Sequence, residues 1–165
     1  VVIMIKKIII TVTIIASIFI IISLLKNNNN LDNIYKYPVS KNNYYDDYVY
    51  DVYSDHINII TYNGSDKNII IPALIDDLPV LSIEDSAFYG NSDIETVVIP
   101  YTVIKIGNQS FIGCLNLKSL YIPKSIIFVG DNALDNCPNL ESIYINKNTK
   151  QKNIFKNYKK YIKYK

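Results

Sequence analysis

The sequence predicts a β-rich solenoid of about three coils, with an N-terminal β-hairpin cap, preceded by one transmembrane or signal helix. Three observations predict this architecture. Apolar residues recur in fixed columns with a period of 23 residues. Apolar and polar residues alternate within each unit, as a β-strand with one buried face requires. An uncharged run of 18 residues lies near the N-terminus.

Composition restricts the possible functions. The chain has 165 residues, of which 49% are hydrophobic, enough for one modest domain with a buried core. All 17 basic residues are Lys. Because proteins that read bases or phosphates depend on Arg for bidentate contacts, we expect no nucleic-acid partner. Charge is unevenly distributed, since residues 31–146 hold all 15 acidic residues and 147–165 hold eight Lys and no acid.

Residues 1–26 form the predicted helix, as a signal anchor or a signal peptide. The uncharged run 8–25 would span about 27 Å as a helix, close to the thickness of a bilayer's hydrocarbon core. It is longer than a typical signal-peptide core and has no Ala-x-Ala cleavage pattern, which favours an uncleaved anchor over a cleaved signal. Lys6 and Lys7 precede the run, so we expect a single-pass membrane protein with the rest of the chain outside, or else a secreted one.

Residues 27–77 connect this helix to the repeats. The segment 27–47 is rich in Asn, Asp and Tyr without an apolar period, which predicts a polar spacer. Residues 48–77 form the predicted N-terminal cap and a partial repeat. Residues 48–53 and 57–62 alternate in polarity around a turn at 54–56, which predicts a hairpin covering the first coil.

Residues 78–146 contain the three units 78–100, 101–123 and 124–146, without insertions. One column contains Phe88, Phe111 and Leu134, and another contains Val97, Leu120 and Ile143. A unit this small cannot bury its own apolar residues, so stacked units must bury them against one another. Gly107 and Gly130 follow the second extended stretch and suit a tight turn.

These motifs resemble the BspA-like class of leucine-rich repeats. The resemblance rests on Ile99-Pro100, Ile122-Pro123, the segment 106–111 (IGNQSF), Cys114 and Cys137, and it covers about residues 48–146. The last unit departs from the pattern at Leu134 and Asn146, as a terminal repeat often does. The resemblance implies a surface-exposed or secreted binding protein, often an adhesin, without catalytic activity.

The Lys-rich tail, residues 147–165, has two readings. Ile154, Tyr158, Tyr161 and Ile162 fall at helical spacing, which favours a solubilising, partly helical C-terminal cap. The alternative is contact with an anionic surface such as cell-wall polymer or lipid headgroups.

Conventional catalytic and metal-binding patterns are missing. His56 is the only imidazole and falls in the predicted turn, so we expect no enzyme, no metal site and no cofactor. Cys114 and Cys137 lie one period apart, about a strand spacing (~4.8 Å) if the coils stack. Parallel side chains in one column rarely meet disulfide geometry, so we favour free buried thiols over a disulfide.

The candidate ligand-binding residues are those that alternate with the buried strand residues. They form two outward columns: Thr96, Ser119 and Ser142 in one, and Ile70, Val98, Tyr121 and Tyr144 in the other. Stacked Tyr beside small hydroxyls suits a binding surface, because Tyr provides contact area with few rotatable bonds. The Tyr residues could instead serve only cross-strand packing.

Three functions are therefore open. The first is an extracellular module that binds a protein or glycan and is attached to the membrane through residues 8–25. The second is a structural or antigenic surface component without a dedicated ligand. The third is an accessory domain of an enzyme complex.

Overall fold

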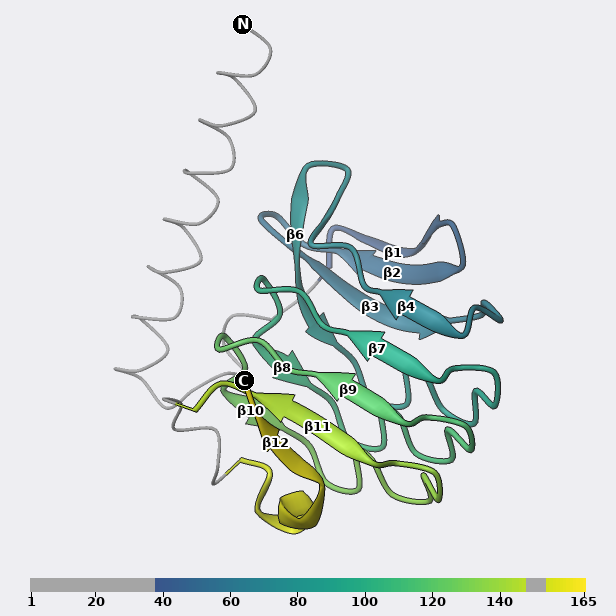
Figure 1. Ribbon diagram of the computed structural model, residues 1–165. Helices are drawn as coiled ribbons and strands as arrows, with labels where there is room; N and C mark the ends of the chain where they lie inside the picture. The colour runs from purple at the N-terminus through teal and green to yellow at the C-terminus, as the bar shows by residue number, and fades with distance from the viewer. Residues whose placement is uncertain (1–37, 148–153) are drawn as a thin grey trace, which may run out of the picture. The chain divides into compact units, whose positions relative to one another are not determined.

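The computed structural model describes residues 38–147 and 154–165. All of their secondary structure lies in the unit Val39–Lys165. Two sheets form opposite sides of a solenoid (Figure 1). The first sheet has the order β1-β2-β3-β6-β8-β10 with β5 added beside β6, and the second has the order β12-β11-β9-β7-β4. The strands of the first sheet are β1 (Ser40–Tyr45), β2 (Tyr48–Val52), β3 (Ile57–Tyr62), β5 (Leu74–Ile75), β6 (Leu78–Ile83), β8 (Lys105–Ile106) and β10 (Phe128–Val129).

The second sheet is parallel throughout and contains β4 (Asn68–Ile70), β7 (Thr96–Val98), β9 (Ser119–Tyr121), β11 (Ser142–Ile145) and β12 (Ile162–Tyr164). Its register confirms the 23-residue period, because Val97 lies opposite Leu120, and Leu120 lies opposite Ile143. All three side chains are fully buried. The solenoid has about four turns rather than the three we expected, because the partial repeat at β4 and the C-terminal β12 both join this sheet.

An aromatic ladder runs through the middle of the coils. Phe88 and Phe111 stack with their ring centroids 4.8 Å apart and their planes 16° apart. Tyr62 of the hairpin stacks on Phe88 at 5.3 Å, and Tyr48 packs on Tyr62 at 4.9 Å. The predicted Phe column is therefore confirmed, and the cap extends it by two Tyr rings.

The turns between strands repeat at the same 23-residue spacing. Gly90, Gly113 and Asn136 all have positive φ, at 66°, 73° and 55°. Glycine and asparagine tolerate this left-handed region better than other residues. Gly107 is needed for a different reason from the tight turn that we predicted. A Cβ atom there would lie 2.5 Å from the backbone nitrogen of Asp85 in the preceding coil, so Gly107 permits close stacking of coils.

The N-terminal cap is larger than the sequence predicted. The antiparallel pair β2–β3 confirms the predicted hairpin, and β3 joins β6 in parallel, so the cap continues the first sheet. The segment that we expected to be part of a polar spacer contains a third strand, β1, paired antiparallel with β2. Its side chains are almost all exposed, so β1 is held by main-chain pairing and leaves no apolar period in the sequence.

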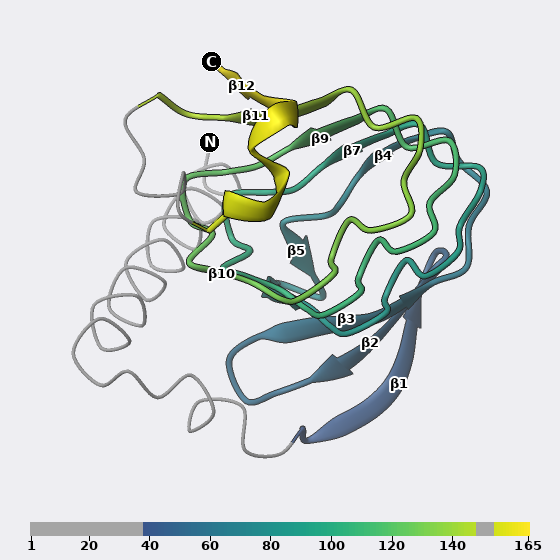
Figure 2. The same ribbon diagram turned by 90° about the horizontal axis from the view of Figure 1, so that it is seen from below.

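The Lys-rich tail is the C-terminal cap of the solenoid. It forms a short 3₁₀ helix, η3 (Lys156–Tyr161), followed by β12, which pairs with β11. Seen from below, η3 lies across the end of the last coil (Figure 2). Phe155 and Tyr158 belong to the core, although the tail looked mainly solvated in the sequence. The tail does form a cap, but its helix is a short 3₁₀ helix that ends at Tyr161. Ile162, which we expected on the helix, begins the strand β12 instead.

In the two described ranges, no helix is both long and apolar enough to cross a membrane. The predicted anchor, residues 8–25, lies outside these ranges.

Candidate functional site

The predicted binding residues lie on the outer face of the second sheet. Strand register places Ile70 beside Val98, Val98 beside Tyr121, and Tyr121 beside Tyr144. The same register places Thr96 beside Ser119 and Ser119 beside Ser142. We call these two columns together the strand face. It runs along the solenoid axis because each coil contributes the same positions of one strand.

Exposure along the strand face is uneven. Ile70 is 76% exposed at the N-terminal edge, whereas Val98, Tyr121, Tyr144, Thr96 and Ser119 are half-buried. Ser142 is only 8% exposed, which contradicts its expected place on an open surface. The pairing of Ile143 with Ile162 places Tyr161 next to Ser142, so the C-terminal cap reaches this end of the face.

The two tyrosines form the centre of the strand face. Their ring centroids are 4.6 Å apart and their planes differ by 14°, so the rings stack. The Nζ atom of Lys165 lies 3.9 Å from the centroid of the Tyr121 ring and 5.5 Å from that of Tyr144, which makes a cation–π contact. Lys163 pairs with Tyr144 and continues the column. The face therefore changes from apolar at Ile70 to aromatic and then to basic.

Sequence reasoning missed both lysines because the period of 23 fails in the tail. Ile162 pairs with Ile143, only 19 residues earlier in the chain. The available signal was the alternation of Ile162, Lys163 and Tyr164.

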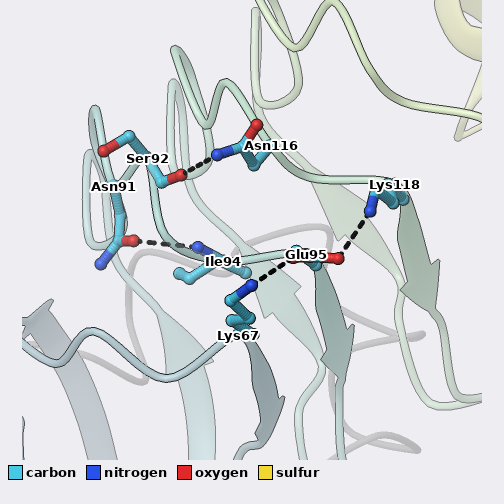
Figure 3. Close-up of polar contacts among 7 residues, drawn as sticks. All are labelled: Lys67, Asn91, Ser92, Ile94, Glu95, Asn116 and Lys118. Carbon is cyan, nitrogen blue, oxygen red and sulfur yellow. Dashed lines mark hydrogen bonds and ion pairs between the residues drawn. The ribbon is translucent and has the colours of Figure 1, made fainter.

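An ion-pair ladder borders the strand face, just before the strands begin (Figure 3). The carboxylate of Glu95 contacts Lys118 at 2.6 Å and Lys67 at 3.2 Å. Hydrogen bonds from Lys118 and Lys67 lower the pKa of Glu95, and the bond to Glu95 raises the pKa of Lys118. Charge thus alternates along three successive coils, from Lys67 through Glu95 to Lys118. The two lysines are exposed and Glu95 is half-buried, so solvent screens these ion pairs and the ladder favours correct register more than stability.

Amide and thiol donors fix the turns behind the strand face. Asn116 Nδ2 donates to the carbonyl of Ser92 at 2.7 Å (Figure 3). Cys114 and Cys137 are free thiols, as predicted, and their Sγ atoms donate at 3.1 Å to the carbonyls of Phe88 and Phe111 in the preceding coil. Burial raises the pKa of Cys114 to about 12 and that of Cys137 to about 11. Both thiols are therefore structural groups and poor nucleophiles.

His56, the one imidazole, lies in the N-terminal cap between β2 and β3. It is fully buried, its Nδ1 lies 2.7 Å from Asp55 Oδ1, and its ring stacks on Tyr53 at 4.5 Å. Within residues 38–147 and 154–165, no three His, Cys, Asp or Glu side chains gather in a group that could hold a metal ion. The strand face itself presents hydroxyls, aromatic rings and ammonium groups, which suit reversible binding.

Comparison with known proteins identifies the family of these repeats. The family described as "BspA type Leucine rich repeat region" matches residues 80–164 in six copies, so its repeats continue through the Lys-rich tail. No curated protein matches the chain.

Solved structures of bacterial leucine-rich repeat proteins share the fold. One from T. pallidum has 28% identity and a TM-score of 0.61, covering 66% of this chain and 52% of its own. A leucine rich cell surface protein from Faecalibacterium prausnitzii has 26% identity and a TM-score of 0.57, covering 61% of this chain and 29% of its own. One from Bacteroides capillosus, with 22% identity and a TM-score of 0.61, covers 73% of this chain and 91% of its own. This chain thus spans about half of the T. pallidum protein and less than a third of the F. prausnitzii protein.

Proposed function

The chain belongs to the BspA-type leucine-rich repeat family, and on that premise we propose that it is a non-catalytic surface protein that binds a protein or glycan through its strand face. The observation that carries the proposal is the outward-facing column that starts at the exposed Ile70 and continues through the half-buried Val98 to the stacked tyrosines. Aromatic and aliphatic groups on a rigid sheet lose little conformational entropy when a ligand covers them.

The proposed role requires a location outside the cell. The F. prausnitzii relative is described as a cell surface protein. The uncharged run 8–25 would serve as the membrane anchor, with the repeats outside, and a secreted form is the alternative.

A structural component without a dedicated ligand is the second candidate. It is favoured by one specific observation: the ring of Tyr121 already contacts Tyr144 and Lys165 within the chain. In this case the tyrosines stabilise the sheet through contacts within the chain and bind no ligand.

Surface plasmon resonance separates these candidates. The full chain, held in mild detergent, is tested against immobilised denatured collagen and against a neutral and an acidic polysaccharide. The test variant is Tyr121→Ser with Tyr144→Ser. The matched control is Tyr89→Ser with Tyr101→Ser, which removes two tyrosines that lie outside the strand face and are 68% and 49% exposed.

The change in binding of the two variants distinguishes the candidate functions. Removal of two central aromatic contacts is expected to weaken binding by about tenfold or more, with the control near the parent. Equal weakening in the control would show non-specific adhesion and contradict the proposal. Unchanged binding in the test variant would place the site elsewhere. If no probe binds and the test variant melts well below the control, the ligand-free structural role is correct.

A further inference from the structure

A cavity of about 610 Å³ lies between the last full coil and the C-terminal cap, and none of the strand-face residues lines it. One wall is the turn that contains Asp135, Asn136 and Pro138, and the other is η3 with Asn157 and Lys160. Figure 2 shows η3 lying across the end of the last coil. The volume is typical of small-ligand sites.

The walls of the cavity are held in place by the core. Phe155, immediately before η3, is fully buried. Tyr158 Oη donates to Asp135 Oδ1 at 3.0 Å and accepts a hydrogen bond from the backbone N–H of Leu134 at 3.3 Å. After η3, β12 pairs with β11. Both walls are therefore anchored, with Asn136 on the turn of the last coil and Asn157 and Lys160 on the cap.

The lining combines three kinds of group. Leu115, which is 51% exposed, Leu134 and Pro138 provide an apolar surface. Asn136 and Asn157 provide amides that both donate and accept hydrogen bonds. Lys160 and Tyr161 provide a cation and an aromatic ring, with Nζ 4.6 Å from the ring centroid.

We propose that this cavity binds an acidic saccharide, such as a uronic acid unit of a surface polymer. The ammonium group of Lys160 would pair with the sugar carboxylate, and the amides of Asn136 and Asn157 would bond to its hydroxyls. The ring of Tyr161 and the apolar lining would contact the C–H face of the sugar. Lys156 and Lys159, both exposed on η3, add positive potential nearby.

Two features favour a sugar over other anions. Asp135 also lines the cavity, and its carboxylate repels a multiply charged phosphate or sulfate more strongly than a singly charged uronate. Its Oδ1 accepts from Tyr158, and its second oxygen can accept a bond from a sugar hydroxyl. None of the lining residues lies in a strand, so an extended acidic peptide finds no main chain to pair with here. The proposed contacts use no strand-face residue, so this inference does not rest on the proposed function.

Isothermal titration calorimetry of the full chain in mild detergent tests the proposal. The probes are trigalacturonic acid, its neutral counterpart galactotriose, and a short poly-glutamate peptide. Lys160→Gln removes the charge in the cavity. Lys41→Gln is the matched control, because it removes the same charge from the exposed strand β1 in the N-terminal cap. Thermal melts confirm that both variants fold.

Trigalacturonic acid should bind, and Lys160→Gln should weaken its binding about tenfold or more, since a charge-assisted hydrogen bond is lost. Lys41→Gln should bind as the parent does, and galactotriose should bind the parent and Lys160→Gln equally weakly. Absence of binding by trigalacturonic acid would overturn the proposal. So would equal losses in the two variants, or equal binding of poly-glutamate, because each would indicate general charge attraction. If Lys160→Gln fails to fold, Asn157→Ala replaces it, and full retention of sugar binding in that variant would overturn the proposal.

Discussion

Replacement of Phe111 by Ala tests whether the stacked aromatic ladder holds the coils together. Phe111 is fully buried and stacks on Phe88 at 4.8 Å, and Cys137 of the next coil donates to its carbonyl. Truncating such a side chain costs about 3–5 kcal/mol through lost burial and an unfilled cavity. The ring-on-ring contact contributes about 0.5–1.5 kcal/mol beyond the buried area. A short domain has a total stability of only about 5–15 kcal/mol, so the loss should be large.

The internal repeat supplies the graded comparison. Leu134 occupies the Phe position in the following coil, so Phe111→Leu should cost much less than Phe111→Ala. Tyr89→Ala removes an exposed ring and should change the free energy of unfolding by about 0.5 kcal/mol or less. Urea denaturation followed by circular dichroism measures all three. A midpoint for Phe111→Ala equal to that of Tyr89→Ala would refute the ladder as the core of the coils.

Three further predictions follow from the turns, the ladder of charges and the thiols. Gly107→Ala should lower the free energy of unfolding by about 1–3 kcal/mol, because its Cβ would meet backbone atoms of the preceding coil. Gly90→Asn should leave the thermal melt nearly unchanged, since Asn136 has the same left-handed conformation at the equivalent position. Lys118→Gln should raise the pKa of Glu95 toward its ordinary value in a carbon-detected NMR titration, and an unchanged pKa would rule out the ion pair. Cys114 and Cys137 have pKa values of about 12 and 11 in the fold, so the unfolded chain loses these thiol protons at a lower pH than the folded chain does. The free energy of unfolding should therefore fall as the pH rises above about 9. Alkylation of the two thiols at pH 8 should be slow until the chain unfolds.

The sequence predicted the parts of the fold that depend on burial. The columns through Phe88 and Val97 repeat at one spacing, and each lies in the core as expected. The orientation of the strand face follows from the same alternation, which is why the Tyr121–Tyr144 pair could be located in advance.

The features that the sequence did not predict depend on main-chain pairing or on a change of spacing. β1 is held to β2 by backbone hydrogen bonds and has mostly exposed side chains, so it resembled a spacer. β12 pairs with β11 at a spacing of 19 residues instead of 23. The 23-residue period therefore predicted neither the basic end of the strand face nor the burial of Ser142. The role of Gly107 could not be read from its own sequence position, because the atoms that require it belong to the preceding coil.

The central claim is that η3 and β12 close the C-terminal end of the solenoid, where β12 pairs with β11, extends the strand face and forms one side of the cavity. Amide hydrogen exchange by NMR on the full chain tests this most directly. The N–H of Lys165 donates to the carbonyl of Ile145 at 3.0 Å, and β12 pairs with β11 along its length. We predict strong protection of the β12 amides that is lost in Phe155→Ala while β7 and β9 stay protected. Exchange of the parent β12 amides at the rate of an unstructured peptide would contradict the account.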